Sequence, residues 1–390
     1  MIAYLLKLSV EANNNRYYKM IQDGNIFNVE YGRVGATPMK SKKPMEFWKE
    51  TYDKHIADGY VDRTKYLSCE TKCELQYKPI VDKDVADMID FLLRSANKEL
   101  KMNYSVSYVD VSEKMIEEAQ DVIYKMSENP TVENINTLLP KLFVIIPRKM
   151  KNIRDCTIQS KEEIPSVLQR EQNLLDVMAA KVFYLGKVTN YEKDKTILED
   201  NDLDISLITS EKKINQIKGF MGNNGKQFVR AFRVHNKNTD KSFERYMKKN
   251  NLSKNDIHYL YHGSKNMNYW NIMVQGQKLN PKAPITGKMF GHGLYYANKA
   301  EKSIRYTSLK GSYYAHGTSD IGYLAVFKVV YKNPLDVSVH DSWMCNIRTK
   351  DDIRGHDALF AHAGGSLFND EIIVYDENQV TLQYLIEIKS

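Results

Sequence analysis

Cysteine is scarce in this sequence. The 390 residues include only Cys69, Cys73, Cys156 and Cys345, too few for the disulfide framework that stabilises many secreted domains. We therefore expect a reducing, intracellular compartment. Cys69 and Cys73 have no second pair of cysteine or histidine residues nearby, whereas zinc prefers four ligands. We interpret both as ordinary thiols and expect no metal site.

Long apolar runs are missing as well. The first run, Ile2 to Leu6, is followed at once by Lys7 and is too short for the apolar region of a signal peptide. Internal runs such as Leu142 to Ile146 fall far short of the roughly 20 residues that span a bilayer. We expect neither secretion nor a role in a membrane.

Several familiar catalytic motifs do not occur. The sequence contains no G-x-S-x-G, no Walker A and no H-E-x-x-H motif. Gly291-His292-Gly293 lacks the third glycine of a dinucleotide-binding fingerprint. The enzyme classes that depend on these motifs therefore lose their usual support.

Length and charge set broad limits. A chain of 390 residues predicts two to four domains, since domains usually have roughly 100–200 residues. The 56 basic and 49 acidic residues give a net charge of +7. This modest excess is compatible with a nucleic-acid-binding patch but does not establish one.

The first 74 residues predict a small β-sheet with one helix. Short apolar runs flank Asp23-Gly24, which is a hairpin signal. From Pro44 to Ile56, large apolar residues recur every three or four positions and predict a helix.

Two further segments differ in their hydrophobic period. Residues 77–220 carry apolar stripes of period 3.6, which begin at Val85, Met115 and Ile164 and predict an all-α bundle. Residues 228–390 predict strands at Gly322–Tyr331 and Glu371–Tyr375, and an alternating strand from Val380 to Ile388. The expected fold class is multidomain α+β, with a mixed α/β domain at the C-terminal end.

Four short motifs follow one another in the last 160 residues. They are Tyr261-His262-Gly263-Ser264, Met289 to Ala297, Lys302 to Tyr306, and Asn369 to Tyr375. Taken singly, each has an ordinary structural interpretation: a core histidine, buried aromatic residues, or an acidic residue that blunts a strand edge.

Together, these motifs resemble the catalytic domain of the poly(ADP-ribose) polymerase (PARP) family. That resemblance implies a diphtheria-toxin-like ADP-ribosyltransferase fold, a catalytic triad of His262, Tyr295 and Glu371, and NAD as a substrate with no metal. The block from Gly364 to Tyr375 is the most specific part of the match.

The resemblance also implies a nicotinamide slot. Tyr295 and Tyr306 would supply its aromatic faces, while the Gly263 backbone and the Ser303 hydroxyl would bind the carboxamide. Glycine at 263 would let the backbone approach the ligand closely because it lacks a Cβ atom.

Further contacts follow from the same comparison. His262 and Ser264 would hydrogen-bond the adenosine ribose, and Lys278 stands near the adenine where relatives have arginine, so a planar fork is lost. Met289 and Phe290 resemble the acceptor-side loop of polymerising members.

The N-terminal segment resembles a WGR domain. Asn15-Arg16-Tyr17-Tyr18 and Tyr31-Gly32-Arg33-Val34-Gly35 carry the resemblance, with Tyr31 in place of the tryptophan. Arg33 and the following Lys40, Lys42 and Lys43 form a stretch without acidic residues, which suits phosphate contacts. The resemblance implies that Tyr31 and these four cations bind DNA; a solvated basic loop is the alternative.

The middle helices resemble the regulatory helical domain of DNA-dependent members. Leu139 to Pro147 and Asn173 to Asp176 match its pattern, while Gln172 stands where an acidic residue is expected. The implied order is a WGR-like domain at 1–74, a regulatory helical domain at 77–220 and a transferase domain at 228–390, with no added N-terminal tail or zinc fingers.

We therefore expect a DNA-break-stimulated protein ADP-ribosyltransferase, and a poly rather than mono transferase, whose helical bundle blocks NAD until DNA binds. Its partners would be broken DNA, NAD and acceptor proteins including itself, in a nucleus or, in a bacterium, the cytoplasm. The alternatives are a DNA-end-binding scaffold with weak or no turnover, a mono-ADP-ribosyltransferase, and an RNA-modifying or toxin-like transferase.

Overall fold

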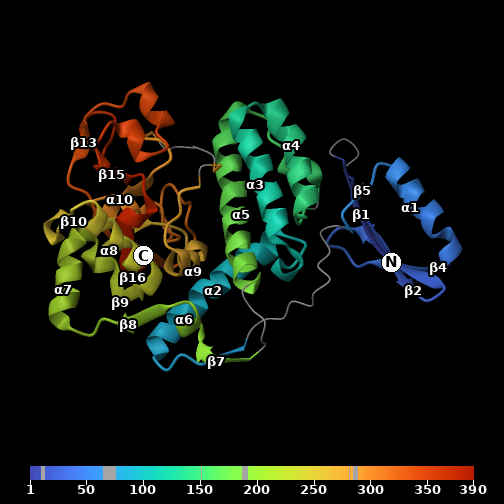
Figure 1. The fold of residues 1–390 in the computed structure, drawn as a ribbon, viewed down its shortest axis with the longest axis horizontal. Helices are drawn as coiled ribbons and strands as arrows, with labels where there is room; N and C mark the ends of the chain where they lie inside the picture. Colours follow the sequence, from blue (N-terminus) through green and yellow to red (C-terminus); the bar gives the residue numbers. More distant parts are fainter. Residues whose placement is uncertain (10–13, 65–75, 151, 187–191, 281, 284–288) are drawn as a thin grey trace. The chain divides into compact units, whose positions relative to one another are not determined.

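The computed structural model describes residues 1–9, 14–64, 76–150, 152–186, 192–280, 282–283 and 289–390. The chain divides into two compact units (Figure 1). Unit 1 comprises Met1–Glu74, Lys98–Tyr191 and Lys282–Thr286, and unit 2 comprises Leu75–Asn97, Glu192–Pro281 and Gly287–Ser390. No helix in the described ranges is long and apolar enough to span a membrane.

An antiparallel sheet begins unit 1. Its strands are β1 (Ile2–Ser9), β2 (Asn14–Asp23), β3 (Ile26–Arg33), β4 (Met39–Pro44) and β5 (Val61–Asp62), in the order β4-β3-β2-β1-β5. The predicted hairpin at Asp23-Gly24 is confirmed, since Asp23 pairs with Ile26 and Gly24 has a φ of +60° that favours glycine.

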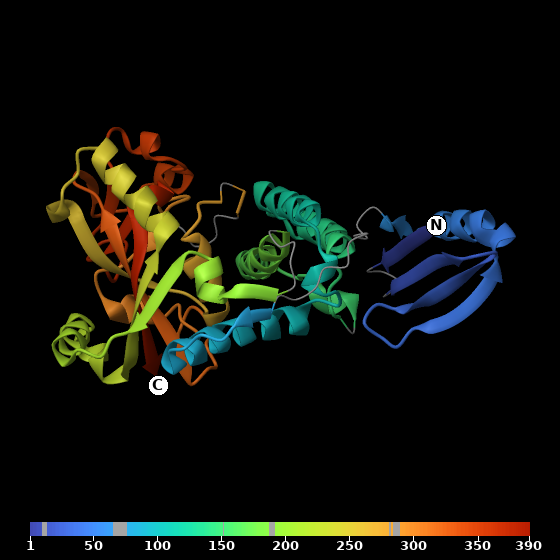
Figure 2. The same ribbon diagram turned by 60° about the horizontal axis from the view of Figure 1, so that its bottom comes forward.

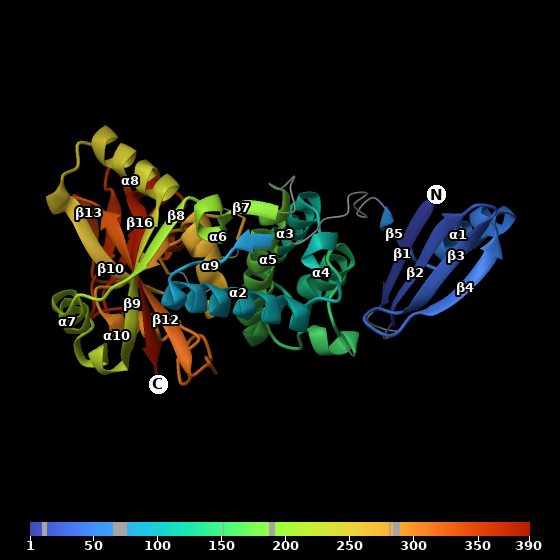
Figure 3. The ribbon, with the colours of Figure 1, turned by 90° about the horizontal axis from the view of Figure 1, so that it is seen from below.

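Helix α1 (Trp48–Ala57) confirms the predicted N-terminal helix and lies along one face of this sheet (Figure 3). A short 3-10 turn, Met45–Phe47, precedes it. Trp48 packs edge-on against the buried Phe27, with ring centroids 5.2 Å apart. Trp48 and Tyr52 close a core built from the sheet residues Ala3, Leu5, Tyr18, Met20, Phe27 and Val29.

Four long helices follow in the sequence: α2 (Lys83–Asn103), α3 (Glu113–Glu128), α4 (Val132–Ile145) and α5 (Ile164–Gly186). Single 3-10 turns lie at Tyr108–Asp110, Ile153–Cys156 and Lys161–Glu163. In unit 1, α3 packs against both α4 and α5. A capping interaction precedes α5, since the Glu163 carboxylate accepts the Ser160 backbone N–H at 2.9 Å.

Unit 2 contains two main sheets (Figure 2). The antiparallel five-stranded sheet has the order β10-β12-β16-β9-β8, with strands β8 (Leu203–Leu207), β9 (Phe228–Asn236), β10 (Ile257–Gly263), β12 (Ile321–Val330) and β16 (Val380–Lys389). The four-stranded sheet has the order β11-β15-β14-β13, with strands β11 (Leu294–Tyr296), β13 (Pro334–Val337), β14 (Ala358–Ala361) and β15 (Glu371–Val374). A separate parallel pair joins β6 (Gln76–Lys78) to β7 (Glu192–Thr196).

Shorter helices surround these sheets. They are α6 (Ile197–Asp200), α7 (Glu211–Phe220), α8 (Lys237–Lys249), α9 (Asn266–Gln275) and α10 (Ala300–Ile304), with 3-10 turns at Gly222–Gln227, Lys254–Asp256, Ser342–Asn346, Lys350–Ile353 and Glu377–Gln379. Unit 2 is therefore a mixed α/β unit, distinct from the N-terminal β-sheet and the helical region of unit 1.

The first half of α2 belongs to the core of unit 2. Val85, Met88, Ile89 and Leu92 are buried with Phe327 and other residues of the five-stranded sheet. Residues 192–220 also join unit 2, since β8 pairs with β9. The segment predicted as helical, 77–220, therefore contributes to both units, and its bundle helices end at Gly186.

The last strand, β16, is buried along both of its faces. Its alternating sequence predicts one polar face, yet Thr381, Gln383 and Glu387 are all less than 8% exposed. Glu387 accepts hydrogen bonds from Arg230 at 2.9 Å and from Tyr323 at 3.0 Å, so its charge is compensated inside the protein.

Candidate active site

His262 and Gly263 lie at the end of β10, beside the strand that carries Tyr295. Tyr261 and Ala297 exchange backbone hydrogen bonds of 2.8 and 2.9 Å, which hold β10 next to the end of β11. His262 Nδ1 lies 3.1 Å from the Tyr295 carbonyl oxygen. This contact places the proton on Nδ1, so Nε2 is the acceptor nitrogen of the neutral ring.

Gly263 approaches the backbone of α10 more closely than any other residue type could. A Cβ atom at this position would lie 1.7 Å from the Ser303 carbonyl oxygen. Ser303 itself is buried on α10. The predicted carboxamide contacts, the Gly263 backbone and Ser303, are thus brought together by the fold.

The Ser264 backbone and side chain are both held by α9. The Ser264 N–H donates to the Tyr269 hydroxyl at 3.1 Å, and the Asn268 amide donates to Ser264 Oγ at 2.9 Å. Tyr269 is completely buried and donates to the Tyr323 carbonyl oxygen at 2.8 Å. These contacts fix the turn that follows His262.

The Tyr295 hydroxyl closes the loop that precedes β11. It donates to the Gly291 carbonyl oxygen at 3.0 Å and accepts the Phe290 N–H at 3.1 Å. Burial raises the pKa of Tyr295 well above its ordinary value, so the hydroxyl keeps its proton.

The two predicted acceptor-side residues have different surroundings. Phe290 is 1% exposed and packs into the core around Met344 and Ile347, so its side chain occupies the interior of the unit. Met289 is only partly buried, and its carbonyl oxygen lies 2.9 Å from His340 Nε2. Of this pair, Met289 is the residue with an accessible side chain.

Glu371 begins β15, the strand that pairs with β11. Its carboxylate forms an ion pair with the Lys302 ammonium, and the two side chains are 14% and 13% exposed. Burial lowers the pKa of Lys302, while the charge of Glu371 opposes this shift. Lys302 was not among the predicted site residues, although it is the first residue of the motif from Lys302 to Tyr306 and stands next to Ser303.

Asp370 holds the chain just before Glu371. Its carboxylate accepts the Ala363 N–H at 2.8 Å and the Asn298 amide at 2.7 Å. The Ala363 hydrogen bond is the main reason that the pKa of Asp370 lies below its ordinary value.

Tyr306 lies within the electrostatic reach of Glu371. Burial and the Glu371 charge raise the pKa of Tyr306 to about 12. Its ring remains 39% exposed and stacks on Tyr314. A partly exposed aromatic ring near a carboxylate is suited to a planar cationic ligand such as a pyridinium ring.

Lys278 is held by an acidic residue. Its ammonium lies 2.9 Å from the Glu377 carboxylate, which also accepts the Leu279 N–H at 2.7 Å. Lys278 lines a cavity of about 140 Å³ between α8, α9 and the start of β16. No other predicted site residue is among the described residues that line this cavity.

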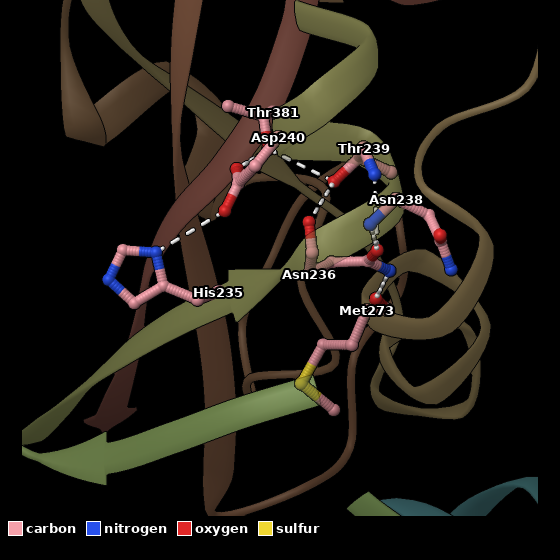
Figure 4. Close-up of polar contacts among 7 residues, drawn as sticks. All are labelled: His235, Asn236, Asn238, Thr239, Asp240, Met273 and Thr381. Atoms are coloured by element: carbon pink, nitrogen blue, oxygen red, sulfur yellow. Dashed lines mark hydrogen bonds and ion pairs between the residues drawn. The ribbon is translucent and has the colours of Figure 1, made fainter. Parts of the chain in front are cut away.

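A polar cluster supports the same region from the side of α8 (Figure 4). The Asn236 amide donates to the Met273 carbonyl oxygen at 2.7 Å near the end of α9, and its oxygen caps the first N–H groups of α8. Asp240 accepts the Thr381 hydroxyl at 2.6 Å and contacts His235 Nδ1 at 3.3 Å. The cluster ties α8 to α9 and to β16.

Metal ligands are not gathered at this site. Within the described ranges, no group of three or more histidine, cysteine, aspartate or glutamate side chains is arranged to hold a metal ion. The pair Cys69 and Cys73 lies outside the described residues.

Comparison with known proteins identifies the family. Residues 211–316 match the sequence model of the poly(ADP-ribose) polymerase catalytic domain, a range that includes His262 and Tyr295. Uncharacterized protein 101L of Invertebrate iridescent virus 6 is 30% identical over 174 residues, covering 43% of this chain and 73% of that protein. Poly [ADP-ribose] polymerase 1 of Xenopus laevis is 22% identical over 402 residues and that of Gallus gallus 23% over 411, each covering 94% of this chain and 39% of the relative.

The chain belongs to the poly(ADP-ribose) polymerase family. Its PARP catalytic domain is that of an NAD+ ADP-ribosyltransferase, and such domains use NAD+ as a substrate. The chain spans about two fifths of the length of the two vertebrate relatives.

In unit 1 of this PARP, the predicted DNA-binding residues are divided between the two faces of the N-terminal sheet. Lys43 pairs with Phe27 across the sheet, while Tyr31 and Arg33 lie four and six residues after Phe27 on the same strand. All three therefore share the face of the sheet that α1 covers. Lys40 and Lys42 lie on the opposite face, where Lys40 forms a 3.0 Å ion pair with Glu30. The basic stretch is therefore an edge with cations on both sides rather than one flat patch.

Gln172, the departure from the expected acidic residue, belongs to an amide network in unit 1. It is buried, exchanges 2.8 Å hydrogen bonds with Gln120, and donates to Asp176 at 2.8 Å. Gln120 also donates to the Lys282 carbonyl oxygen at 3.1 Å, and the Lys282 ammonium lies 2.6 Å from Asp121. Lys282 is thereby attached to α3.

Proposed function

We propose that this chain is a DNA-break-stimulated, NAD+-dependent protein ADP-ribosyltransferase that builds poly(ADP-ribose) on itself and on other proteins during the response to DNA damage. The observation that carries the proposal is the Glu371 carboxylate, 14% exposed and paired with Lys302, at the start of the strand that pairs with the one holding Tyr295. His262 lies next to that sheet through its contact with the Tyr295 carbonyl oxygen.

In the proposed reaction, the bond between the ribose C1′ atom and the pyridinium nitrogen breaks. Nicotinamide leaves as a neutral molecule with the bonding electron pair, and an acceptor oxygen forms the new bond to C1′ from the opposite face, releasing its proton. The Glu371 carboxylate stabilises the positive charge that develops on the ribose and orients its 2′-hydroxyl. Lys302 holds that carboxylate in place through their ion pair.

The remaining predicted residues bind NAD+. The Gly263 backbone and Ser303 hold the carboxamide, Tyr295 and Tyr306 enclose the ring, and His262 Nε2 accepts a ribose hydroxyl. Ser264 takes part through its own hydroxyl, whose position depends on Asn268. Lys278 would reach the adenine only when it releases Glu377.

Chain elongation requires the acceptor to be a ribose hydroxyl of an ADP-ribose unit already attached. Glu371 can polarise that hydroxyl as well, so a single carboxylate serves both the donor and the acceptor. Of the predicted acceptor-side pair, Met289 is only partly buried, so its side chain is available to contact an acceptor.

DNA dependence is proposed for unit 1, whose N-terminal sheet resembles a WGR domain. The domains proposed are the WGR-like segment 1–74, the regulatory helical segment 77–220 and the transferase segment 228–390. Arg33 and the lysines on β4 would bind phosphates on either side of the sheet edge, and Tyr31 would pack against a sugar or base. The attachment of Lys282 to α3 supports regulation through the helices, because it connects them to a segment between Ser264 and Met289 in the sequence.

The test is NAD+ turnover by the full chain, measured as nicotinamide release, with and without short nicked or blunt DNA. We expect turnover that rises on addition of broken DNA, and polymer that migrates as a ladder on a gel. DNA binding without any turnover would establish the scaffold alternative, and products with a single ADP-ribose would establish mono transfer.

A variant tests the regulatory part separately. Lys282→Ala removes a surface ion pair whose side chains are 54% and 49% exposed, and water screens such a pair so that it contributes little. We expect the rate without DNA to rise by up to about fivefold, with the DNA-saturated rate unchanged. A DNA-free rate equal to that of the parent would contradict a restraining role for this contact.

A further inference from the structure

The loop from Thr307 to Asp320, between α10 and β12, presents two neighbouring tyrosines to solvent. Tyr313 is 70% exposed and Tyr314 is 50% exposed. The apolar area of these two rings is available to pack against a ligand. This loop directly follows Tyr306, the proposed face of the nicotinamide slot.

Hydrogen bonds hold the backbone of this loop in one conformation. The Tyr314 N–H donates to the Arg305 carbonyl oxygen at 2.9 Å, and the Lys310 N–H donates to the Ser319 carbonyl oxygen at 2.8 Å. The hydroxyl of the buried Ser312 donates to the Thr307 carbonyl oxygen at 2.5 Å. Since the backbone is already ordered, the position of the Tyr314 ring costs little additional entropy when a ligand binds.

The Tyr314 ring lies flat against the ring of Tyr306. Their centroids are 4.7 Å apart and their planes differ by 20°, which is a stacked arrangement. Tyr313 meets Tyr314 edge-on, at 5.0 Å and 86°, and is not stacked on Tyr306. Tyr314 thus covers one face of Tyr306, and Tyr306 as a whole remains 39% exposed.

We propose that Tyr314 is a positioning residue for the pyridine ring of nicotinamide, a role that rests on the proposed function. It backs the ring of Tyr306 from behind, so that a planar aromatic carboxamide binds on the open face of Tyr306 as the third layer of a stack. The Tyr314 ring fixes the plane of the Tyr306 ring, which would otherwise sample other rotamers at the rim of the site. Tyr314 thereby sets how tightly the slot holds nicotinamide, both in NAD+ and as the released product.

The test is calorimetric titration of nicotinamide into the full chain and into three variants. In Tyr314→Ala the stacked ring is absent, whereas Tyr314→Phe keeps the ring and removes only the hydroxyl. Tyr313→Ala is the matched control, because it removes an equally large exposed ring from the same loop without touching Tyr306. Circular dichroism and the thermal midpoint establish that each variant is folded.

We expect Tyr314→Ala to bind nicotinamide about three- to tenfold more weakly, the effect of losing one aromatic pair. Tyr314→Phe and Tyr313→Ala should bind within about twofold of the parent. In steady-state assays, Tyr314→Ala should raise KM for NAD+ by a similar factor with kcat nearly unchanged, because the residue acts on binding. A change in stability alone would not produce this division between KM and kcat.

Two results would overturn the inference. Equal binding by Tyr314→Ala and Tyr313→Ala would mean that the stack does not support the slot, and tighter binding by Tyr314→Ala would mean that Tyr314 occupies the ligand's own position. In both cases the proposed function stands, since the parent binds nicotinamide and turns over NAD+. A parent that neither binds nicotinamide nor consumes NAD+ would refute the function and this inference together.

Discussion

Replacing Glu371 with glutamine separates the charge of this side chain from its size. Glutamine fills nearly the same volume at the start of β15 and retains an acceptor oxygen, but it cannot stabilise positive charge on the ribose as a carboxylate does. A positioned group of this kind typically contributes about 10²- to 10⁴-fold in rate, or roughly 3 to 5.5 kcal/mol. Elongation should suffer most, because it uses the carboxylate for both donor and acceptor.

The same change leaves the Lys302 ammonium without its partner in a site where it is only 13% exposed. The pKa of Lys302, already lowered by burial, should fall further once the opposing charge of Glu371 is gone. Breaking a buried ion pair costs about 3–5 kcal/mol, and residual exposure favours the lower end. For a unit of this size, about 3 kcal/mol corresponds to a loss of roughly 6–12 °C in the thermal midpoint.

A double variant distinguishes catalysis from stability. Lys302→Met combined with Glu371→Gln removes both charges, so we expect it to recover part of the thermal midpoint lost by either single change. Activity should remain as low as in Glu371→Gln, because the catalytic charge is still absent.

The measurements are nicotinamide release, product length on a gel, nicotinamide affinity and the thermal midpoint of each protein. Nicotinamide affinity should change little in Glu371→Gln, since Gly263, Ser303 and Tyr306 remain. Long polymer from Glu371→Gln at the parent rate would refute the role given to Glu371 and with it the polymerase assignment. Strictly additive midpoint shifts in the double variant would refute the energetic importance of the ion pair.

Three other changes have definite outcomes. Gly263→Ala should abolish nicotinamide binding, because its Cβ would lie 1.7 Å from a backbone oxygen. The control Gly219→Ala should bind nicotinamide normally, because a Cβ atom there meets nothing within 4 Å. Equal binding by both variants would contradict the close approach at Gly263. Asp370 has a lowered pKa, so its stabilising effect is complete above about pH 4 and is lost as the pH falls through that lowered value. Asp370→Asn should therefore show a smaller drop in thermal midpoint than the parent between pH 5 and pH 2, and parallel curves would argue against it. Arg33→Ala should weaken DNA binding for all sequences alike and reduce the salt slope by about 1, and an unchanged slope would exclude a phosphate contact there.

Local patterns predicted several elements of the fold. The hairpin at Asp23-Gly24, the helix after Pro44 and the strands that became β12 and β15 depend on turn residues and on short-range periodicity. These signals are encoded within a few neighbouring residues, so they can be read before any tertiary contact is known.

The limits of such patterns appear in α2 and β16. The stripe that begins at Val85 predicts a helix correctly, but periodicity does not say which core receives it, and the first half of α2 joins unit 2. Alternation in β16 predicts a solvated face, yet Glu387 is buried there because Arg230 and Tyr323, distant in sequence, satisfy its carboxylate.

Residue identity also determined the family, because the ordered motifs around His262, Tyr295 and Glu371 are a property of the sequence alone. Tertiary structure decided which neighbours those residues have. It paired Glu371 with Lys302, put Phe290 into the core, and stacked Tyr314 on Tyr306. Each of these contacts depends on loop paths or strand pairings between separate elements, and their energies come from burial and distance, which a linear sequence does not contain.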